Sequence, residues 1–223
     1  WQAMFNNFAV ETIGVGPAEI GGIQAIREIP GLLGFLVGFL VLALTETRLM
    51  ALSIAVLGTG IALTGCASSV ATLLMGTLIM SVGFHFFTPA NNAVLLMAVE
   101  KRSAPRALGQ LRSLGAVAAL LATGAIYLLA GRVGYRPLFW GVGTAAMLVG
   151  MILLPFRFGE EGLPSGRRVR FRRRYWLYYT LAFLLGSRRH IFTTFAVFLL
   201  VKKYGIPVQT TALLYLVNSL INT

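Results

Sequence analysis

The segment FRFGEEGLPSGRRVRFRRRYW, residues 156–176, is a long polar run between two blocks of apolar sequence. Its proline, serine and glycines are typical of a linker, and its seven arginines outnumber its two glutamates. An aromatic cluster, Tyr175, Trp176 and Tyr178, follows the last arginine. Arginines beside interfacial aromatics and long apolar helices are typical of the cytoplasmic side of a membrane protein. We therefore interpret residues 157–174 as a basic cytoplasmic linker, in preference to a nucleic-acid-binding patch.

The composition of the whole chain is that of a membrane protein. Of its 223 residues, 57% are hydrophobic and 12% are charged, and the mean hydropathy is +0.79. A soluble domain carries about 25% charged residues, so this chain has too little polar surface for water. The net charge of +12 is then expected to set orientation and to contact anionic lipid headgroups. The single cysteine, Cys66, excludes an internal disulfide, and its apolar surroundings predict a small buried packing residue.

Apolar stretches of about 20 residues predict membrane-crossing helices. After the end of a first helix at 1–8, and before an eighth that starts near 208, we expect helices at about 20–44, 50–67, 70–98, 108–130, 138–156 and 175–201. The connecting loops are expected at 9–19, 45–49, 68–69, 100–106, 131–137 and 202–208. Because there is no initiator Met and ALLYLVNSLINT ends inside an apolar helix, we expect both ends to be cut.

The basic residues on alternate loops predict the orientation. Eleven lie on one side, from Arg48, the 100–106 loop and the linker, against four from the 131–137 and 202–208 loops. The positive-inside rule makes the first side cytoplasmic.

Two adjacent charges, Arg27 and Glu28, interrupt the second helix. A charge in the hydrocarbon region costs at least about 2.5–3.5 kcal/mol, so it normally faces a cavity or a partner. Adjacent helical residues point about 100° apart, so we expect each to pair with another helix. Two roles remain open: a salt bridge that fixes packing or a gate, and direct contact with cargo or a proton.

The fourth helix carries His85, and Asn91 and Asn92 follow it beyond Pro89. Proline removes a backbone donor and can open a helix locally. His85 and Asn92 are seven residues apart and therefore share a face. The histidine is either a group that changes charge near neutral pH or a satisfied polar core residue.

The seventh helix carries Arg188, Arg189 and His190 near the middle of its span. At least one of the two arginines is expected to line a water-filled cavity or to pair with a carboxylate. Guanidinium groups in a cavity suit an anionic cargo, although a structural pair is equally compatible. Glu28, His85 and His190 are the candidates for a proton relay.

Cofactor and metal chemistry are not expected from this sequence. Only two histidines occur and they lie on different helices, which argues against a metal site. The chain has no G-x-x-x-x-G-K-[ST] motif for ATP. No nucleophile–base pair or paired carboxylates occur at a useful spacing, so we do not expect an enzyme.

Glycines recur within the predicted helices and predict close helix packing; backbone flexing during a transport cycle is the alternative. They lie in the second, third and fifth helices: Gly31, Gly34 and Gly38; Gly58, Gly60 and Gly65; Gly109, Gly115 and Gly124.

Six helices, a long basic loop and a further series of helices resemble the major facilitator superfamily over essentially the whole chain. In that family, two six-helix halves flank a cargo site near the membrane midplane. The family's charged loop between the second and third helices corresponds to Leu42–Leu49, where Glu46 and Arg48 are its remnants and thus gate-loop candidates. The fifth helix lacks the proline of the drug/proton antiporter motif, which disfavours drug efflux. Family members line the cavity with their first, fourth and seventh helices, which matches the positions around His85 and Arg188.

The resemblance implies an all-α, polytopic transmembrane helical bundle. Its N-terminal half would be residues 1–156, its linker residues 157–174, and the start of its C-terminal half residues 175–223. It also implies a secondary active transporter that moves a small solute by alternating access, coupled to H+ or Na+, in the plasma (inner) membrane. The midplane arginines favour an anionic cargo. The alternatives are a permease subunit of an ATP-driven transporter and a non-transporting membrane scaffold or sensor with the same fold.

Overall fold

The structure of the chain is a computed structural model that describes residues 1–157, 173–177, 180–181 and 199–221. The predictions at Arg188, Arg189 and His190, and those on most of the linker, fall outside these residues. Helices account for the secondary structure of the described part, and this confirms the predicted all-α bundle.

The helices follow one another with short connections. They are α1 (Gln2–Asn7), η1 (Phe8–Ile13, a π-helix), α2 (Pro17–Arg27), α3 (Ile29–Leu32), η2 (Leu33–Leu36, a 3-10 helix), α4 (Val37–Ala43), α5 (Glu46–Gly65), α6 (Val70–Ala98), α7 (Ala104–Val133), α8 (Tyr135–Leu153), η3 (Arg173–Tyr175, a 3-10 helix) and α10 (Val208–Ile221). Among the described residues, α5, α6, α7 and α8 are long and apolar enough to cross a membrane. The segment from α2 to α4, bent by 52°, would be a fifth, broken span.

The loop predicted at 9–19 is mostly helical, and that prediction was wrong. Helix α1 continues into the π-helical turns of η1, and Gly14 ends them with a left-handed φ of 77°. Pro17 then starts α2 within its first turn, where a missing N–H costs nothing. The Glu19 carboxylate accepts a hydrogen bond from the Gly16 N–H at 2.7 Å and caps the new helix. Only residues 14–16 are left as a turn.

Two other predicted loops are also shorter than expected. The polar segment 45–49 begins α5, because the Thr45 hydroxyl caps it by accepting from the Arg48 N–H at 3.4 Å. Glu46 and Arg48 therefore lie in the first turn of a helix. The loop at 131–137 shrinks to Gly134, whose φ of 81° favours glycine. The turn at 68–69 is where it was predicted, since Ser69 caps α6 through Thr72.

Helix α5 packs against both α6 and α8. A methyl group on Gly65 would stand 2.8 Å from the Cβ of Phe139, and Gly58 meets the backbone of α8 directly. Gly60 meets Met80 of α6 in the same way. Small residues thus let the helices approach closely, and the predicted packing role of the third-helix glycines is confirmed. Glycines of α6 and α8 complete both contacts: Gly76, Gly83, Gly143 and Gly150.

Within the described residues, the fifth helix shows no such close packing at its glycines. Apart from the helix's own nearby residues, no described atom lies within 4 Å of a Cβ placed on Gly109, Gly115 or Gly124. The prediction for Cys66 was wrong, because this residue is exposed at the end of α5. The Trp140 indole N–H donates to its sulfur at 3.2 Å.

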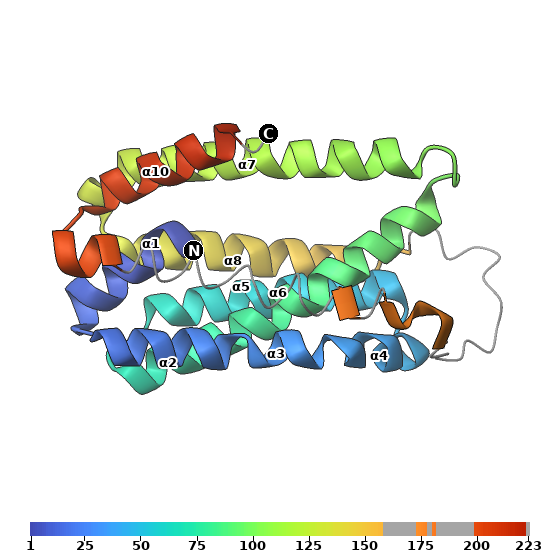
Figure 1. The fold of residues 1–223 in the computed structure, drawn as a ribbon, viewed down its shortest axis with the longest axis horizontal. Helices are drawn as coiled ribbons and strands as arrows, with labels where there is room; N and C mark the ends of the chain where they lie inside the picture. The colour runs from blue at the N-terminus through green and yellow to red at the C-terminus, as the bar shows by residue number, and fades with distance from the viewer. Residues whose placement is uncertain (158–172, 178–179, 182–198, 222–223) are drawn as a thin grey trace.

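The two sides of the bundle are built by different helices. Figure 1 shows α2, α3 and α4 end to end along one side, with α10 beside the C-terminal part of α7. The turns between η1 and α2, between α7 and α8, and before α10 lie at one end of the bundle (Figure 1), which we name the distal end.

The buried core differs between the two ends. Near the distal end, Val208 of α10 joins a buried cluster with residues of α1, η1 and α7, including Met4, Phe8 and Ala130. The second described cluster is drawn from α4, α5 and α6 and contains no residue of α10.

Candidate functional site

A break in the second membrane segment positions its charges. Pro30 lacks the N–H that a continuous helix needs, and the Gly31 N–H bonds to the Glu28 carbonyl at 2.9 Å. The α2 helix therefore ends at Arg27. The Ser81 hydroxyl of α6 donates to the Arg27 carbonyl and so ties the break to the neighbouring helix.

Arg27, Glu28 and His85 form one group, which we name the charge cluster. Glu28 Oε1 accepts from Arg27 Nη2 at 2.7 Å and from Arg27 Nε at 3.0 Å. Glu28 Oε2 lies 3.5 Å from His85 Nε2 of α6. The side chains of Arg27, Glu28 and His85 are 10%, 26% and 20% exposed. The expected contact of Glu28 with another helix is present, because His85 belongs to α6. The Arg27 guanidinium instead pairs with the adjacent Glu28, and α2 ends at this point, just before Pro30.

Two residues shape the space around the cluster. A methyl group on Gly31 would stand 2.8 Å from His85 Cε1, so the absence of a side chain there makes room for the imidazole. The Arg27 guanidinium lies 5.5 Å from the centre of the Trp1 ring, within the range of a cation–π contact.

Helix α10 packs against α1 and α7. Tyr215 lies close enough to Arg27 for the guanidinium charge to act on its phenol group. The Tyr215 hydroxyl and Gln24 Oε1, one turn before Arg27, are buried and accept or donate no hydrogen bond within the described residues. Buried polar atoms normally have partners, so these two atoms are suited to meet a polar ligand or water.

The other predicted site residues lie apart from the charge cluster or outside the described residues. Asn91 is half-buried and Asn92 exposed on α6, which runs on through Pro89. They follow His85 by about 9–10.5 Å along the helix axis, at about 1.5 Å per residue. Arg188, Arg189 and His190 are outside the described residues.

The geometry of the charge cluster permits one exchange of partners. A carboxylate held by a guanidinium can accept a proton, which removes most of its attraction for the guanidinium. An anion could then take the carboxylate's place on Arg27. Within the described residues, no group of three His, Cys, Asp or Glu side chains is placed to hold a metal ion.

Sequence reasoning missed four members of the site. Gln24 shares a face with Arg27 and Glu28 by its helical spacing, and this pattern was available in the sequence. Ser81 and Tyr215 come from distant helices, and no sequence pattern links them to α2. The contact of Trp1 with Arg27 joins the start of the chain to the end of α2, and no sequence pattern predicts it.

Comparison with known families agrees with the all-α fold and the membrane-length helices. The chain matches the family described as Major Facilitator Superfamily over residues 2–223. A comparison with curated proteins finds no match. The all-α fold and the membrane-length helices agree with the family match, and members of this family are transporters. The chain therefore belongs to the Major Facilitator Superfamily of membrane transporters.

Proposed function

We propose that the protein is a secondary active transporter that moves a small anionic solute by alternating access, coupled to H+ or Na+. The coarser function follows from family membership: a multi-pass integral membrane protein that meets the lipid bilayer and a small-molecule substrate. The observation that carries the finer proposal is the contact of Glu28 with both Arg27 and His85.

In this proposal, protons and cargo compete through the charge cluster. With Glu28 ionised, Arg27 is neutralised by its neighbour, and the site has little attraction for an anion. Protonation of Glu28 weakens its two hydrogen bonds from Arg27, because a neutral acceptor binds a guanidinium less strongly than a carboxylate does. The guanidinium then binds the anion, and His85 is the nearest described group to exchange the proton. Loading with H+ and with cargo would thereby be linked.

The position of α10 supports an alternating-access cycle. Val208 of α10 joins the buried core at the distal end with residues of α1, η1 and α7, and the charge of Arg27 reaches Tyr215 of the same helix. We therefore propose that the site lies between the two halves, as alternating access requires. We propose that residues 1–156 and 175–223 belong to the two halves and that residues 157–174 form a cytoplasmic linker. We also propose that the protein lies in the plasma (inner) membrane.

Flux into liposomes without ATP tests this proposal. Purified protein would be reconstituted, and uptake of labelled succinate, gluconate or inorganic phosphate would be followed under an imposed pH or Na+ gradient. Uptake that follows one gradient is the expected result, with protein-free liposomes as the control. Uptake that needs ATP and a second subunit would favour a permease component. Absence of any gradient-driven flux would favour a scaffold or sensor.

A further inference from the structure

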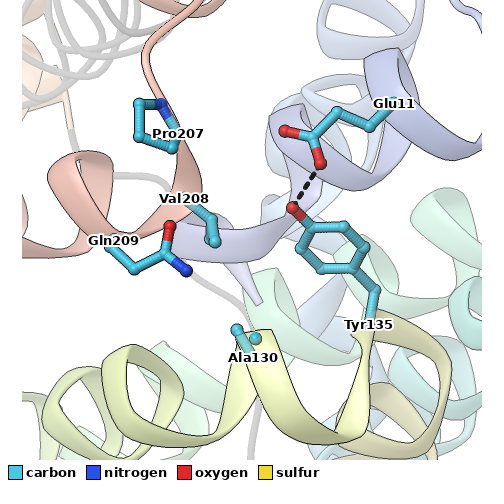
Figure 2. Close-up of a pocket in the computed structure, with 7 residues that line it drawn as sticks. Glu11, Ala130, Tyr135, Pro207, Val208 and Gln209 are labelled. Atoms are coloured by element: carbon cyan, nitrogen blue, oxygen red, sulfur yellow. Dashed lines mark hydrogen bonds between the residues drawn. The ribbon is translucent and has the colours of Figure 1, made fainter.

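A pocket of about 270 Å³ lies at the distal end, where four helical elements meet. Figure 2 shows Glu11 and Tyr135 on one side of it and the start of α10 on the other. Its lining residues are Glu11, Ala130, Gly131, Tyr135, Pro207, Val208 and Gln209. The first four belong to the first half, and the last three belong to the segment that enters α10.

Glu11 is the charged residue of this pocket, and both of its oxygens are engaged. The Tyr135 hydroxyl of α8 donates to Glu11 Oε2 at 2.6 Å. The Asn7 amide donates to Glu11 Oε1 at 2.9 Å. Glu11 is itself exposed, so its carboxylate links α8 and α1 at the surface of the bundle.

Asn7 connects this network to the second half. Its side chain is fully buried, and its Nδ2 also approaches the Ile206 carbonyl at 3.4 Å. Both partners of Nδ2, the Glu11 carboxylate and the Ile206 carbonyl, are acceptors. A flipped amide would place the Asn7 Oδ1 against these two oxygens, which is unfavourable. The Asn7 Oδ1 accepts no hydrogen bond from any described residue. The two contacts of Nδ2 therefore set the amide's orientation.

The same segment is held by apolar contacts. Val208 is 5% exposed and packs in the buried cluster with Met4, Phe8 and Ala130. The helix before Gly205 ends in an αL turn, in which Gly205 has a φ of 59° and its N–H bonds to the Val201 carbonyl at 3.0 Å. The next residue, Ile206, turns its carbonyl toward Asn7.

We propose that Glu11 is a positioning residue of the distal closure: it orients Asn7 so that the Asn7 amide fastens the segment before α10 to the first half. The inference rests on the proposed transport function in one respect: release of the Asn7–Ile206 contact would open the distal end during the transport cycle. The contact itself is independent of the cargo.

The expected change in the opening equilibrium follows from two hydrogen bonds. Asn7 bonds directly to the Ile206 carbonyl, and Glu11 acts indirectly by bonding to Asn7. Loss of the Glu11 carboxylate leaves the amide of Asn7 without its shorter contact and weakens its hold on Ile206. Each such bond contributes enough to change an opening equilibrium about two- to tenfold. Because Glu11 is exposed, Glu11→Ala leaves the buried cluster intact.

A cysteine at the buried position Val208 reports the opening. The chain would carry Cys66→Ser and Val208→Cys, and its reaction with a maleimide would be timed in detergent, where both ends of the bundle are accessible. Glu11→Ala should raise the rate about two- to tenfold, and Asn7→Ala should raise it at least as much. In the Asn7→Ala background, Glu11→Ala should add nothing. Thr12→Ala, at the exposed neighbouring position, is the matched control.

Three results would overturn the proposal. The first is an unchanged rate in both Glu11→Ala and Tyr135→Phe, where the second variant removes one hydroxyl and preserves the fold. The second is an equal increase in Thr12→Ala. The third is an effect of Glu11→Ala that persists without the Asn7 amide, because Glu11 would then act by another route. Flux measured on the same variants separates the two ideas: a rate effect without any flux removes the transport proposal and leaves the closure in place.

Discussion

Replacement of Glu28 by Gln tests the charge cluster as a physical unit. The change keeps the size of the side chain and removes the charge that faces Arg27, whose side chain is 10% exposed. A fully buried pair that loses one partner costs about 3–5 kcal/mol. Glu28 is 26% exposed, and Gln still offers an oxygen to Arg27. We therefore expect a loss nearer that of a hydrogen bond to a charged group, about 1.5–3 kcal/mol.

Thermal unfolding of the purified protein in detergent measures this loss. For a chain of this length, each kcal/mol shifts the melting temperature by about 2–4 °C, so Glu28→Gln should lower it by about 3–12 °C. Glu100→Gln is the matched control, because Glu100 is exposed in the connection between α6 and α7.

A double-mutant cycle decides whether the effect arises from the pair. Arg27→Gln alone should also destabilise the protein, since it leaves Glu28 without the guanidinium. The double variant should lose less than the sum of the single losses, with a coupling of about 0.5–3 kcal/mol. Additivity within about 0.3–0.5 kcal/mol would refute the reasoning, because residues that act independently give that result.

Three further variants test the packing around the site, each by thermal unfolding in detergent. Gly58→Leu should destabilise by at least about 1–3 kcal/mol, because a side chain there meets the backbone of α8; Gly124→Leu, placed in open space, should not. Arg136→Gln should cost about 1.5–3 kcal/mol, because its guanidinium caps the end of α5 with bonds of 3.1 and 2.9 Å to two carbonyls. Gly134→Ala should cost about 1–3 kcal/mol, because φ is 81° and ψ is 172° there. Stability equal to that of the parent chain in any of the three would contradict the corresponding contact.

The fold followed from the sequence because membrane helices must satisfy their own backbone hydrogen bonds. The bounds of α6, at residues 70–98, were predicted correctly because Ser69 supplies a strong cap. The segment 9–19 was mistaken for a loop because its glycines and proline look like a turn. The left-handed φ at Gly14 and the helix start at Pro17 compress that turn to three residues.

The site was only partly predictable, for a physical reason. Charges in an apolar helix are conspicuous, so Arg27 and Glu28 could be found from the sequence alone. Their mutual contact depends on the break before Pro30, and the contact with His85 depends on room left by Gly31. Glu11 was not predicted as a site residue because it lay in a predicted loop, where a solvated carboxylate needs no partner. Its contacts with Tyr135 and Asn7 exist only because η1 extends the first helix.

Proton movement coupled to anion uptake tests the central claim most directly. Liposomes that contain the protein and a trapped pH-sensitive dye would receive external succinate, gluconate or phosphate, with Glu28→Gln and Glu100→Gln compared at equal incorporation. The account predicts a proton signal with one of these anions in the parent chain and in Glu100→Gln, and its loss in Glu28→Gln. An equal proton signal in Glu28→Gln would contradict the role of the charge cluster in coupling.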